Sequence, residues 1–493
     1  MRALKTIALI FFFNIAPLPL PAHYTFSTAL ANTYKMVLHM QVDSADILIN
    51  QCYKNDPQNN INLLVANYID FMKLAATEDY GMYNTLSKNQ DIRLKILKND
   101  NTNSPYKQYI MGEIYFQWAF LKLKFGREIS GFWDLLKAYN LLQTNARQYP
   151  TFVYHKKSLG LLHIMLSLIP PSYKWAVKAM GYTVDLNTGI SEIYEVIRSN
   201  TAISDEASLM MLWLNLLILQ SDNPAKSFAP ADSMARNSPY HAAKLIQAYA
   251  FKKKNKIENA INILENLPPN SGLHYTPYLY FFKAHLYLYK GEYASCKHNA
   301  ELFIKKYKGI TLKKSVYYHL YLADYLSGNN KKLASYRDTI LKVGKTFSEF
   351  DKIAYKAMQN EQKPSLYIIK SRLLYDGGYY HQSMAELAKI HPDTLHNDRE
   401  YTEYYYRHAR IYQALDDTAK AIKYYEITIA KQTNKDYYFA PNAHLQIANL
   451  YKNTQPDIAM KHLENVEKYS GYEYEYSIHS ESVILKNYIK QKY

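Results

Sequence analysis

Residues 157–193 read KSLGLLHIMLSLIPPSYKWAVKAMGYTVDLNTGISEI, a stretch that predicts three successive helices. Between Leu159 and Ile169, apolar side chains cover most of the surface of the first helix. Such a helix is buried on several sides or lies in a membrane. The apolar run is shorter than the roughly 20 residues that a bilayer requires, and His163 interrupts it. We therefore expect a buried helix at the centre of a helical protein.

Helix-breaking residues divide this stretch. Pro170 and Pro171 end the first helix, because proline has no amide donor and clashes with the preceding turn. Ser172 is suited to begin the second helix, and Gly181 stands where a left-handed helix end commonly falls. The third helix follows from about residue 187.

The same stretch carries a pattern of small residues and prolines that resembles a known family. The pattern is a glycine, a leucine-rich helix ending in S-L-x-P-P, a short helix, G-[FY], an aspartate and G-[IL]. Its residues here are Gly160, Ser167, Leu168, Pro170, Pro171, Gly181, Tyr182, Asp185, Gly189 and Ile190. This pattern resembles the eukaryotic inclusion-body-clearance and tetratricopeptide-repeat-thirty-nine proteins over about residues 110 to 200, where the segment FGREISGFWDLLKAY (125–139) also fits.

The resemblance implies a non-enzymatic helical adaptor, in a family linked to clearing aggregated protein and to lipid handling. We expect the motif residues to have a structural role. The chain departs from these cytosolic proteins at its N-terminus, so the resemblance does not carry the cellular role over.

The first 22 residues, MRALKTIALIFFFNIAPLPLPA, have the features of an export signal. Arg2 and Lys5 precede a short apolar core at residues 7–15, and three prolines then lead to Ala22, a small residue suited to cleavage. No cysteine follows the core, which argues against a bacterial lipoprotein. We expect a mature chain that starts near His23 and is exported to a bacterial periplasm or cell exterior. An uncleaved anchor is the alternative.

We expect the signal at residues 1–22 to precede an N-terminal helical domain at 23–222, a linker at 223–239 and a repeat array at 240–493. The linker prediction rests on SDNPAKSFAPADS (221–233), which is rich in Pro, Ser, Asp and Ala. Apolar periodicity predicts the helices of the N-terminal domain, at 28–38, 43–52, 60–75, 79–98, 105–124, 129–148, 152–169, 173–180, 187–199 and 205–221.

The C-terminal half carries a repeat with tetratricopeptide spacing, in which small residues let two helices approach and bulky ones fill the groove beside them. In residues 401–435 these positions are Ala409, Tyr412, Ala421 and Tyr425. The same spacing recurs in 241–270, 277–310, 364–392 and 441–470, and more loosely in 315–345. Because each pair buries its apolar face only by stacking on the next, the sequence predicts an all-α, tetratricopeptide-like solenoid of antiparallel helix pairs. Residues 472–493 read as a final helix that caps the array.

Composition agrees with stacked helices. The 493 residues include 50 tyrosines against 15 glycines, which suits aromatic packing between helices or reflects a compositional bias. The formal net charge is +16, and the densest basic run, FKKKNK (251–256), falls at a repeat turn. Such a run is usually a solvated loop, with contact to nucleic acid or to an anionic membrane as the alternative. We expect Cys52 and Cys296 to be free and buried.

No constellation in the sequence indicates catalysis. Gly344-Lys345-Thr346 lacks the first glycine of a phosphate loop, because position 339 is Thr339. His381, His391 and His396 lie close in sequence but lack partners at ligand spacing, so we interpret them as loop and surface histidines. We expect no cofactor and no metal.

These observations favour a non-enzymatic, exported scaffold that holds a protein or peptide partner on its concave face through exposed tyrosines and lysines. A carrier of a lipid or other apolar ligand is the alternative, with its cavity between the apolar helices at 159–169 and 209–219. A glycan-binding protein of the outer membrane is a third reading, and the missing lipoprotein cysteine argues against it. We expect no nucleic-acid partner and no transmembrane segment after signal cleavage.

Overall fold

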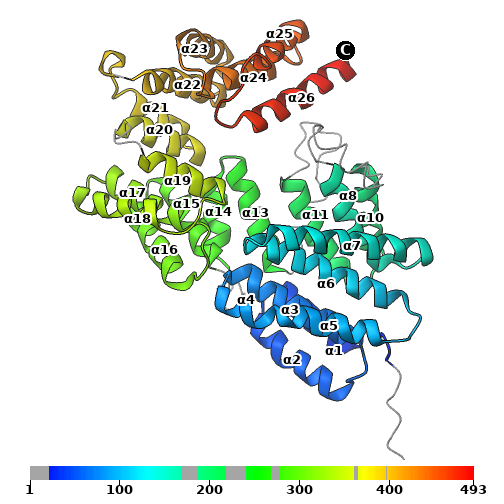
Figure 1. Cartoon of the computed structure of the whole chain (residues 1–493). Helices are drawn as coiled ribbons and strands as arrows, with labels where there is room; N and C mark the ends of the chain where they lie inside the picture. Colours follow the sequence, from blue (N-terminus) through cyan, green and yellow to red (C-terminus); the bar gives the residue numbers. More distant parts are fainter. Residues whose placement is uncertain (1–21, 168–185, 218–239, 268–276, 360–364, 396) are drawn as a thin grey trace, which may run out of the picture. The chain divides into compact units, whose positions relative to one another are not determined.

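The computed structural model describes residues 22–167, 186–217, 240–267, 277–359, 365–395 and 397–493, and helices dominate them (Figure 1). Within these residues the β contacts amount to one isolated bridge between His23 and Asn59. The predicted export signal and the second helix of the central stretch lie outside the described residues. No described helix is long and apolar enough to cross a membrane.

Contacts divide the chain into two compact units, each described here by itself. Unit 1 comprises residues 1–37, 41–73 and 81–207, and unit 2 comprises residues 38–40, 74–80 and 208–493. The predicted linker at 223–239 falls outside the described residues, so the domain limits stay a prediction.

Within the described residues, the helices predicted for the N-terminal half are present with closely matching limits, except the one predicted at 79–98; the helix predicted at 173–180 lies outside the described residues. Their bounds are α1 (Thr28–Leu38), α2 (Val42–Asn55), α3 (Ile61–Thr77), α4 (Tyr80–Leu86), α5 (Lys88–Asn99), α6 (Pro105–Lys124), α7 (Glu128–Gln148), η1 (Val153–His155), α8 (Lys156–Ser167), α10 (Leu186–Arg198) and α11 (Ser204–Leu217). The pairs α6–α7 and α8–α10 make the densest contacts.

One prediction in this half was wrong, because the helix expected over 79–98 is divided at Ser87 into α4 and α5. The hydroxyls of Thr85 and Ser87 donate to the carbonyls of Gly81 and Asn84. Such local side-chain bonds compete with the regular helical pattern.

The central helix is buried, as predicted. In α8, Leu159, Leu162 and Ile164 are at most 2% exposed. Gly160 faces Gly189 of α10 so closely that a Cβ on Gly160 would lie 2.7 Å from the Gly189 carbonyl oxygen. A Cβ on Gly189 would likewise lie 2.5 Å from the Gly160 oxygen. The two helices therefore meet backbone to backbone, which only glycine allows.

Unit 2 is a solenoid of helix pairs. The pairs are α13 (His241–Lys253) with α14 (Ile257–Glu265), α15 (Tyr278–Lys290) with α16 (Tyr293–Lys306), α17 (Lys313–Leu326) with α18 (Leu333–Lys342), α20 (Leu366–Gly377) with α21 (Tyr380–Leu387), α22 (Asp398–Ala414) with α23 (Thr418–Lys431), and α24 (Phe439–Tyr451) with α25 (Pro456–Val466). The final helix, α26 (Glu475–Lys492), packs against α24 and α25 and so closes the array, as the sequence predicts.

The small residues of the predicted repeat lie where the paired helices touch. Seven of these alanines have no exposed surface, namely Ala248, Ala260, Ala284, Ala409, Ala421, Ala448 and Ala459. Two turns between paired helices use glycine in the left-handed region, Gly291 at φ 81° and Gly378 at φ 88°, where other residues would be strained. The repeat spacing thus identified the packing contacts correctly.

The first helices of successive pairs also contact one another, from α15 through α17, α20 and α22 to α24. We call these five the inner helices. One element of unit 2 is absent from the sequence prediction. Helix α19 (Glu349–Gln359) follows the loosely fitting repeat at 315–345 and packs against α17 and α18.

Candidate partner-binding groove

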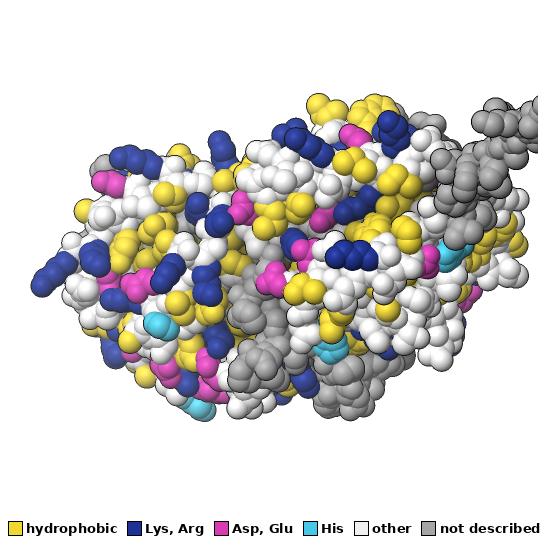
Figure 2. Space-filling model, turned by 90° about the horizontal axis from the view of Figure 1, so that it is seen from below, with side chains coloured by type: hydrophobic (Ala, Val, Ile, Leu, Met, Phe, Trp, Pro, Cys, Tyr) yellow, Lys and Arg dark blue, Asp and Glu magenta, His cyan; other side chains and the backbone are white. Residues whose placement is uncertain are grey.

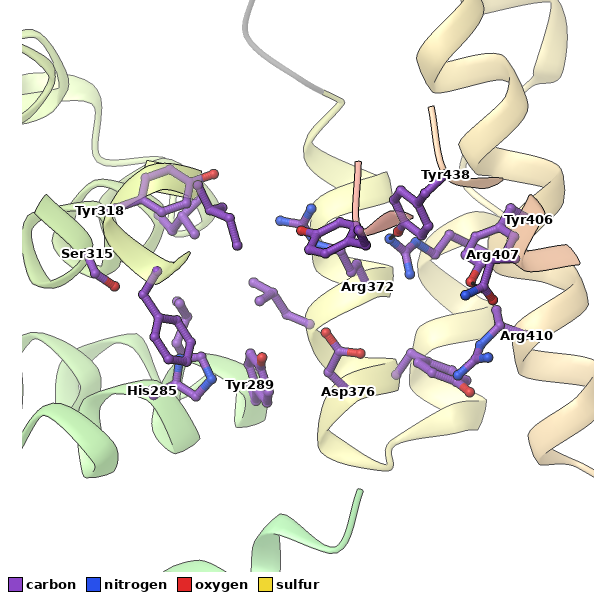
Figure 3. Close-up of a pocket in the computed structure, with 18 of the residues that line it drawn as sticks. His285, Tyr289, Ser315, Tyr318, Arg372, Asp376, Tyr406, Arg407, Arg410 and Tyr438 are labelled. Carbon is purple, nitrogen blue, oxygen red and sulfur yellow. Dashed lines mark hydrogen bonds between the residues drawn. The ribbon is translucent and has the colours of Figure 1, made fainter. Parts of the chain in front are cut away.

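A cavity of about 470 Å³ lies along the inner helices of unit 2 (Figure 3). Its lining comes from all five inner helices, with Phe350 and Ile353 from α19 and Tyr474 and Glu481 from the C-terminal segment. We call this cavity the inner groove. Its volume lies in the range of sites that hold a small molecule or a short segment of chain.

One wall of the inner groove carries three arginines. Arg372 stands on α20, and Arg407 and Arg410 stand on α22 (Figure 3). Arg407 is buried and forms an ion pair of 2.7 Å with Glu403, which lies one turn earlier on the same helix. Burial alone would raise the pKa of the Glu403 carboxyl, but Arg407 and Arg372 hold that pKa below its ordinary value.

The other two arginines lie beside aromatic residues. The Arg410 guanidinium lies over the ring of Tyr375, 5.3 Å from its centroid. Arg372 lines the same cavity as Tyr318 of α17. Among the described residues, no carboxylate oxygen lies within 4.0 Å of either guanidinium. Neither guanidinium therefore forms a direct ion pair, and Glu403 and Asp376 act on the charge of Arg372 only from farther away.

The facing wall is aromatic and comes from α15 and α17. Tyr289, Tyr318 and His285 lie across the cavity from the arginine wall (Figure 3). The His285 Nδ1 lies 3.2 Å from the His319 Nε2. Burial lowers the pKa of His319 to about 4 and that of His285 well below its ordinary value. The histidines of this wall are thus neutral at pH 7, and the positive charge lies on the opposite wall.

Amides and carboxylates complete the lining. Asn442 and Gln446 reach the groove from α24, and the Asn442 Oδ1 accepts a hydrogen bond of 3.0 Å from the Tyr406 hydroxyl. Asp376 stands on α20 one turn after Arg372, and Glu481 also lines the cavity. The groove therefore offers cations, aromatic faces and amide groups, which suits binding of a polar ligand.

The sequence analysis predicted a concave face of tyrosines and lysines, and the lysine part was wrong for this groove. Tyrosines line it, but its cations are arginines. Arginine suits a partly buried position because its guanidinium is more weakly hydrated than an ammonium and offers several donors in a plane. Basic side chains of Lys and Arg, mixed with carboxylates and apolar side chains, are spread over the face of the molecule in Figure 2.

A signal in the sequence could have found this wall. The chain has only eleven arginines, and four of them fall between positions 372 and 410. Three of these four, Arg372, Arg407 and Arg410, line the groove, whereas Arg399 forms an ion pair with Glu473. The aromatic wall has no comparable signal, because tyrosine is frequent throughout the chain.

The described residues of the family motif make structural contacts within unit 1. Gly160 and Gly189 form the close contact of α8 with α10, and the Ser167 hydroxyl donates to the Ile164 carbonyl at 2.8 Å. Ile190 lies in α10, and the other motif residues lie outside the described residues, namely Leu168, Pro170, Pro171, Gly181, Tyr182 and Asp185. The structural role of the motif as a whole stays a prediction.

Other sequence candidates are placed as follows. His381 is exposed on α21, so it belongs to a helix where a loop was expected, and His391 is exposed as well. His396 lies outside the described residues. Within the described ranges, no three His, Cys, Asp or Glu residues are grouped to hold a metal ion. Cys52 and Cys296 are free and buried, as predicted.

The interior of unit 1 beside the central helix is polar. Lys157, whose side chain is 3% exposed, forms ion pairs with Glu113 at 3.0 Å and with Glu206 at 2.7 Å. The Tyr34 hydroxyl donates to Glu206. Burial would lower the pKa of Lys157, but the two carboxylates raise it above its ordinary value. A charged cluster here does not suit the apolar ligand of the carrier alternative.

Comparison with known proteins adds little to this picture. No family model matches the chain, and no curated protein matches it either. Among solved structures, the crystal structure of the P58(IPK) TPR domain is similar at 14% identity over 87% of this chain and 99% of that chain, with a TM-score of 0.24. A score this low carries no argument. The fold class therefore rests on the helix pairs themselves, which define a tetratricopeptide-like α-solenoid.

Proposed function

We propose that this chain is a non-enzymatic, exported tetratricopeptide-repeat scaffold that binds a segment of a partner protein in the inner groove of unit 2. The observation that carries the proposal is the convergence of five inner helices on one cavity lined by arginines, tyrosines and amides. Stacked helical repeats characteristically bind extended segments along such a surface.

Export is part of the proposal and rests on the sequence. The positively charged start, the short apolar core and the small residue at Ala22 support a cleaved signal. We place the mature chain in a bacterial periplasm or outside the cell. Its N-terminus, determined by mass spectrometry of protein purified from the host, should lie near His23, whereas an intact residue 1 would contradict export with cleavage.

The resemblance to the inclusion-body-clearance and tetratricopeptide-repeat-thirty-nine proteins supports the same class of function, a helical adaptor. It rests on the glycines, prolines and aspartate of the central stretch. We propose that the chain is a distant, exported relative of these proteins.

Site-specific photocrosslinking in the host tests the binding surface. Tyr474 lines the inner groove and is 50% exposed, whereas Tyr476, two residues later, is 68% exposed and does not line it. A photoreactive phenylalanine analogue at position 474 should trap one defined protein that the same analogue at position 476 does not trap. Equal products from both positions, or none from position 474, would contradict a partner in the groove.

A further inference from the structure

The arginine wall of the inner groove includes two guanidinium groups, those of Arg372 and Arg410, that form no direct ion pair with a carboxylate among the described residues. Of its three guanidinium groups, only that of Arg407 has a carboxylate partner within 4.0 Å among the described residues. Arg410 lies over the ring of Tyr375, and Arg372 lines the cavity without a carboxylate within 4.0 Å. A partly buried cation is most stable when an anion joins it.

We propose that this wall binds an acidic segment of the partner protein and that Arg372 receives one of its carboxylates. This inference rests on the proposed function and specifies the chemistry of the segment. A guanidinium matches a carboxylate with two parallel hydrogen bonds. Arg372 is the natural recipient, because Figure 3 shows it nearer to the aromatic wall of α15 and α17 than Arg407 and Arg410 are.

The rest of the lining fits a polypeptide. Asn442 and Gln446 place side-chain amides beside the arginines, and amides can pair with both the N–H and the C=O groups of an extended backbone. Tyr289, Tyr406 and Tyr438 offer aromatic surface for the intervening side chains. An acidic peptide therefore finds a partner in the groove for each kind of group that it carries.

Two carboxylates in the lining argue against a nucleic acid as the occupant. Asp376 and Glu481 stand among the same residues as the arginines. A polyphosphate backbone would bring its closely spaced charges against both, whereas a peptide can place its separated carboxylates away from them. The charge of the whole chain, +16 at pH 7, also favours the approach of an acidic partner.

The test is fluorescence anisotropy with a panel of labelled Gly-Ser peptides that carry pairs of glutamates at different spacings, each matched by a peptide with glutamine at the same positions. At least one acidic peptide should bind the full-length mature protein more tightly than its glutamine match. Added salt should weaken that binding. If no acidic peptide binds in preference to its match, the inference is wrong.

Variants locate the binding. R372Q should lower the affinity for the acidic peptide by about tenfold or more, which is the typical effect of losing a hydrogen bond to a charged group. R372K should restore part of the affinity, because it keeps the charge and loses the planar fork. R147Q is the matched control, since it removes the same charge from an exposed position on α7. Equal effects of R372Q and R147Q would overturn the assignment to the groove.

A variant with the opposite expected effect separates recognition from misfolding. D376N removes a carboxylate from the groove and should raise the affinity for the acidic peptide by a few-fold. A damaged fold would not raise this affinity. A single-stranded oligonucleotide that displaces the peptide as readily as unlabelled peptide does would overturn the choice of a polypeptide. A partner crosslinked at Tyr474 that shows no acidic preference would leave the proposed function intact and reject this inference alone.

Discussion

Both units bury cations, but they partner them in different ways. In unit 1, Lys157 is matched within the chain by Glu113 and Glu206. In unit 2, Arg372 and Arg410 have no carboxylate oxygen within 4.0 Å among the described residues and line a cavity of about 470 Å³. A buried cation that pairs with carboxylates of the same chain stabilises the folded chain. A cation in a cavity that has no direct carboxylate partner is available to bind a ligand.

In the charged cluster of unit 1, two carboxylates share the single ammonium group of Lys157. Burial raises the pKa of the Glu113 carboxyl, against the opposing effect of Lys157. The Glu113 Oε1 has no hydrogen-bond partner among the described residues. Two carboxylates thus depend on one ammonium, so the unit should be far more sensitive to losing Lys157 than unit 2 is to losing Arg372.

The largest expected effect follows directly. The substitution Lys157→Met leaves Glu113 and Glu206 buried without their cation, and we expect a loss of about 3–5 kcal/mol in the free energy of unfolding. Arg372→Gln should cost about 1 kcal/mol, because Arg372 forms no direct ion pair with a carboxylate among the described residues. Urea-induced unfolding of both variants measures the difference.

The neighbouring Lys156 is the control for the lysine. It pairs with Glu195, and their side chains are 23% and 43% exposed, so Lys156→Met should cost no more than about 1 kcal/mol. Similar losses for Lys156→Met and Lys157→Met would remove the contrast between the two units.

A pH titration sharpens the contrast, because unit 2 also buries histidines without charge. Burial lowers the pKa of His408 on α22 to about 4, from an ordinary value of 6.5. The unfolded chain therefore takes up a proton below pH 6.5 while the folded chain does not, so this contribution to stability falls between about pH 6.5 and pH 4. For His408 the loss is on the order of 3 kcal/mol at most.

The substitution His408→Phe keeps a ring against Tyr404 and Tyr424 and removes the titrating group. It should flatten the fall in the free energy of unfolding between pH 6.5 and pH 4, measured by urea titrations at several pH values. Substituting the exposed His381 by phenylalanine is the matched control. An unchanged pH dependence in His408→Phe would show that this histidine is not held neutral.

The smallest of the three effects concerns the helix contact beneath the charged cluster. Gly160→Ala would place a methyl group 2.7 Å from the Gly189 carbonyl oxygen, and forcing the helices apart should cost about 1–3 kcal/mol. Gly112→Ala on α6 is the control, because its methyl group would meet only the movable Leu142 side chain. Thermal unfolding of the two variants compares a methyl group placed against a backbone carbonyl with one placed against a side chain. Equal stability of the two variants would contradict the close contact of α8 with α10.

The sequence predicted local features well. Apolar periodicity and prolines placed most helices, and the spacing of Ala409, Ala421 and the other small residues identified the contacts within the pairs. These signals work because one helix or one helix pair carries the whole pattern. Helix α19 was missed because it lies between two repeats and belongs to neither.

The sites were harder to predict from the sequence than the helices, because they are assembled from distant parts of the chain. The inner groove joins His285 on α15 to Glu481 on α26, and periodicity says nothing about which helices share a cavity. Lys157 stands at the edge of an apolar run, where a lysine ordinarily reaches solvent. Only tertiary packing brings Glu113 and Glu206 to it.

Hydrogen exchange of the mature protein, with and without the partner trapped through Tyr474, tests the central claim most directly. The inner helices α15, α17, α20, α22 and α24 should gain protection on binding. Their paired helices α16, α18, α21, α23 and α25, and the whole of unit 1, should change little. Protection concentrated on unit 1 or on the paired helices would show that the inner groove is not the binding surface.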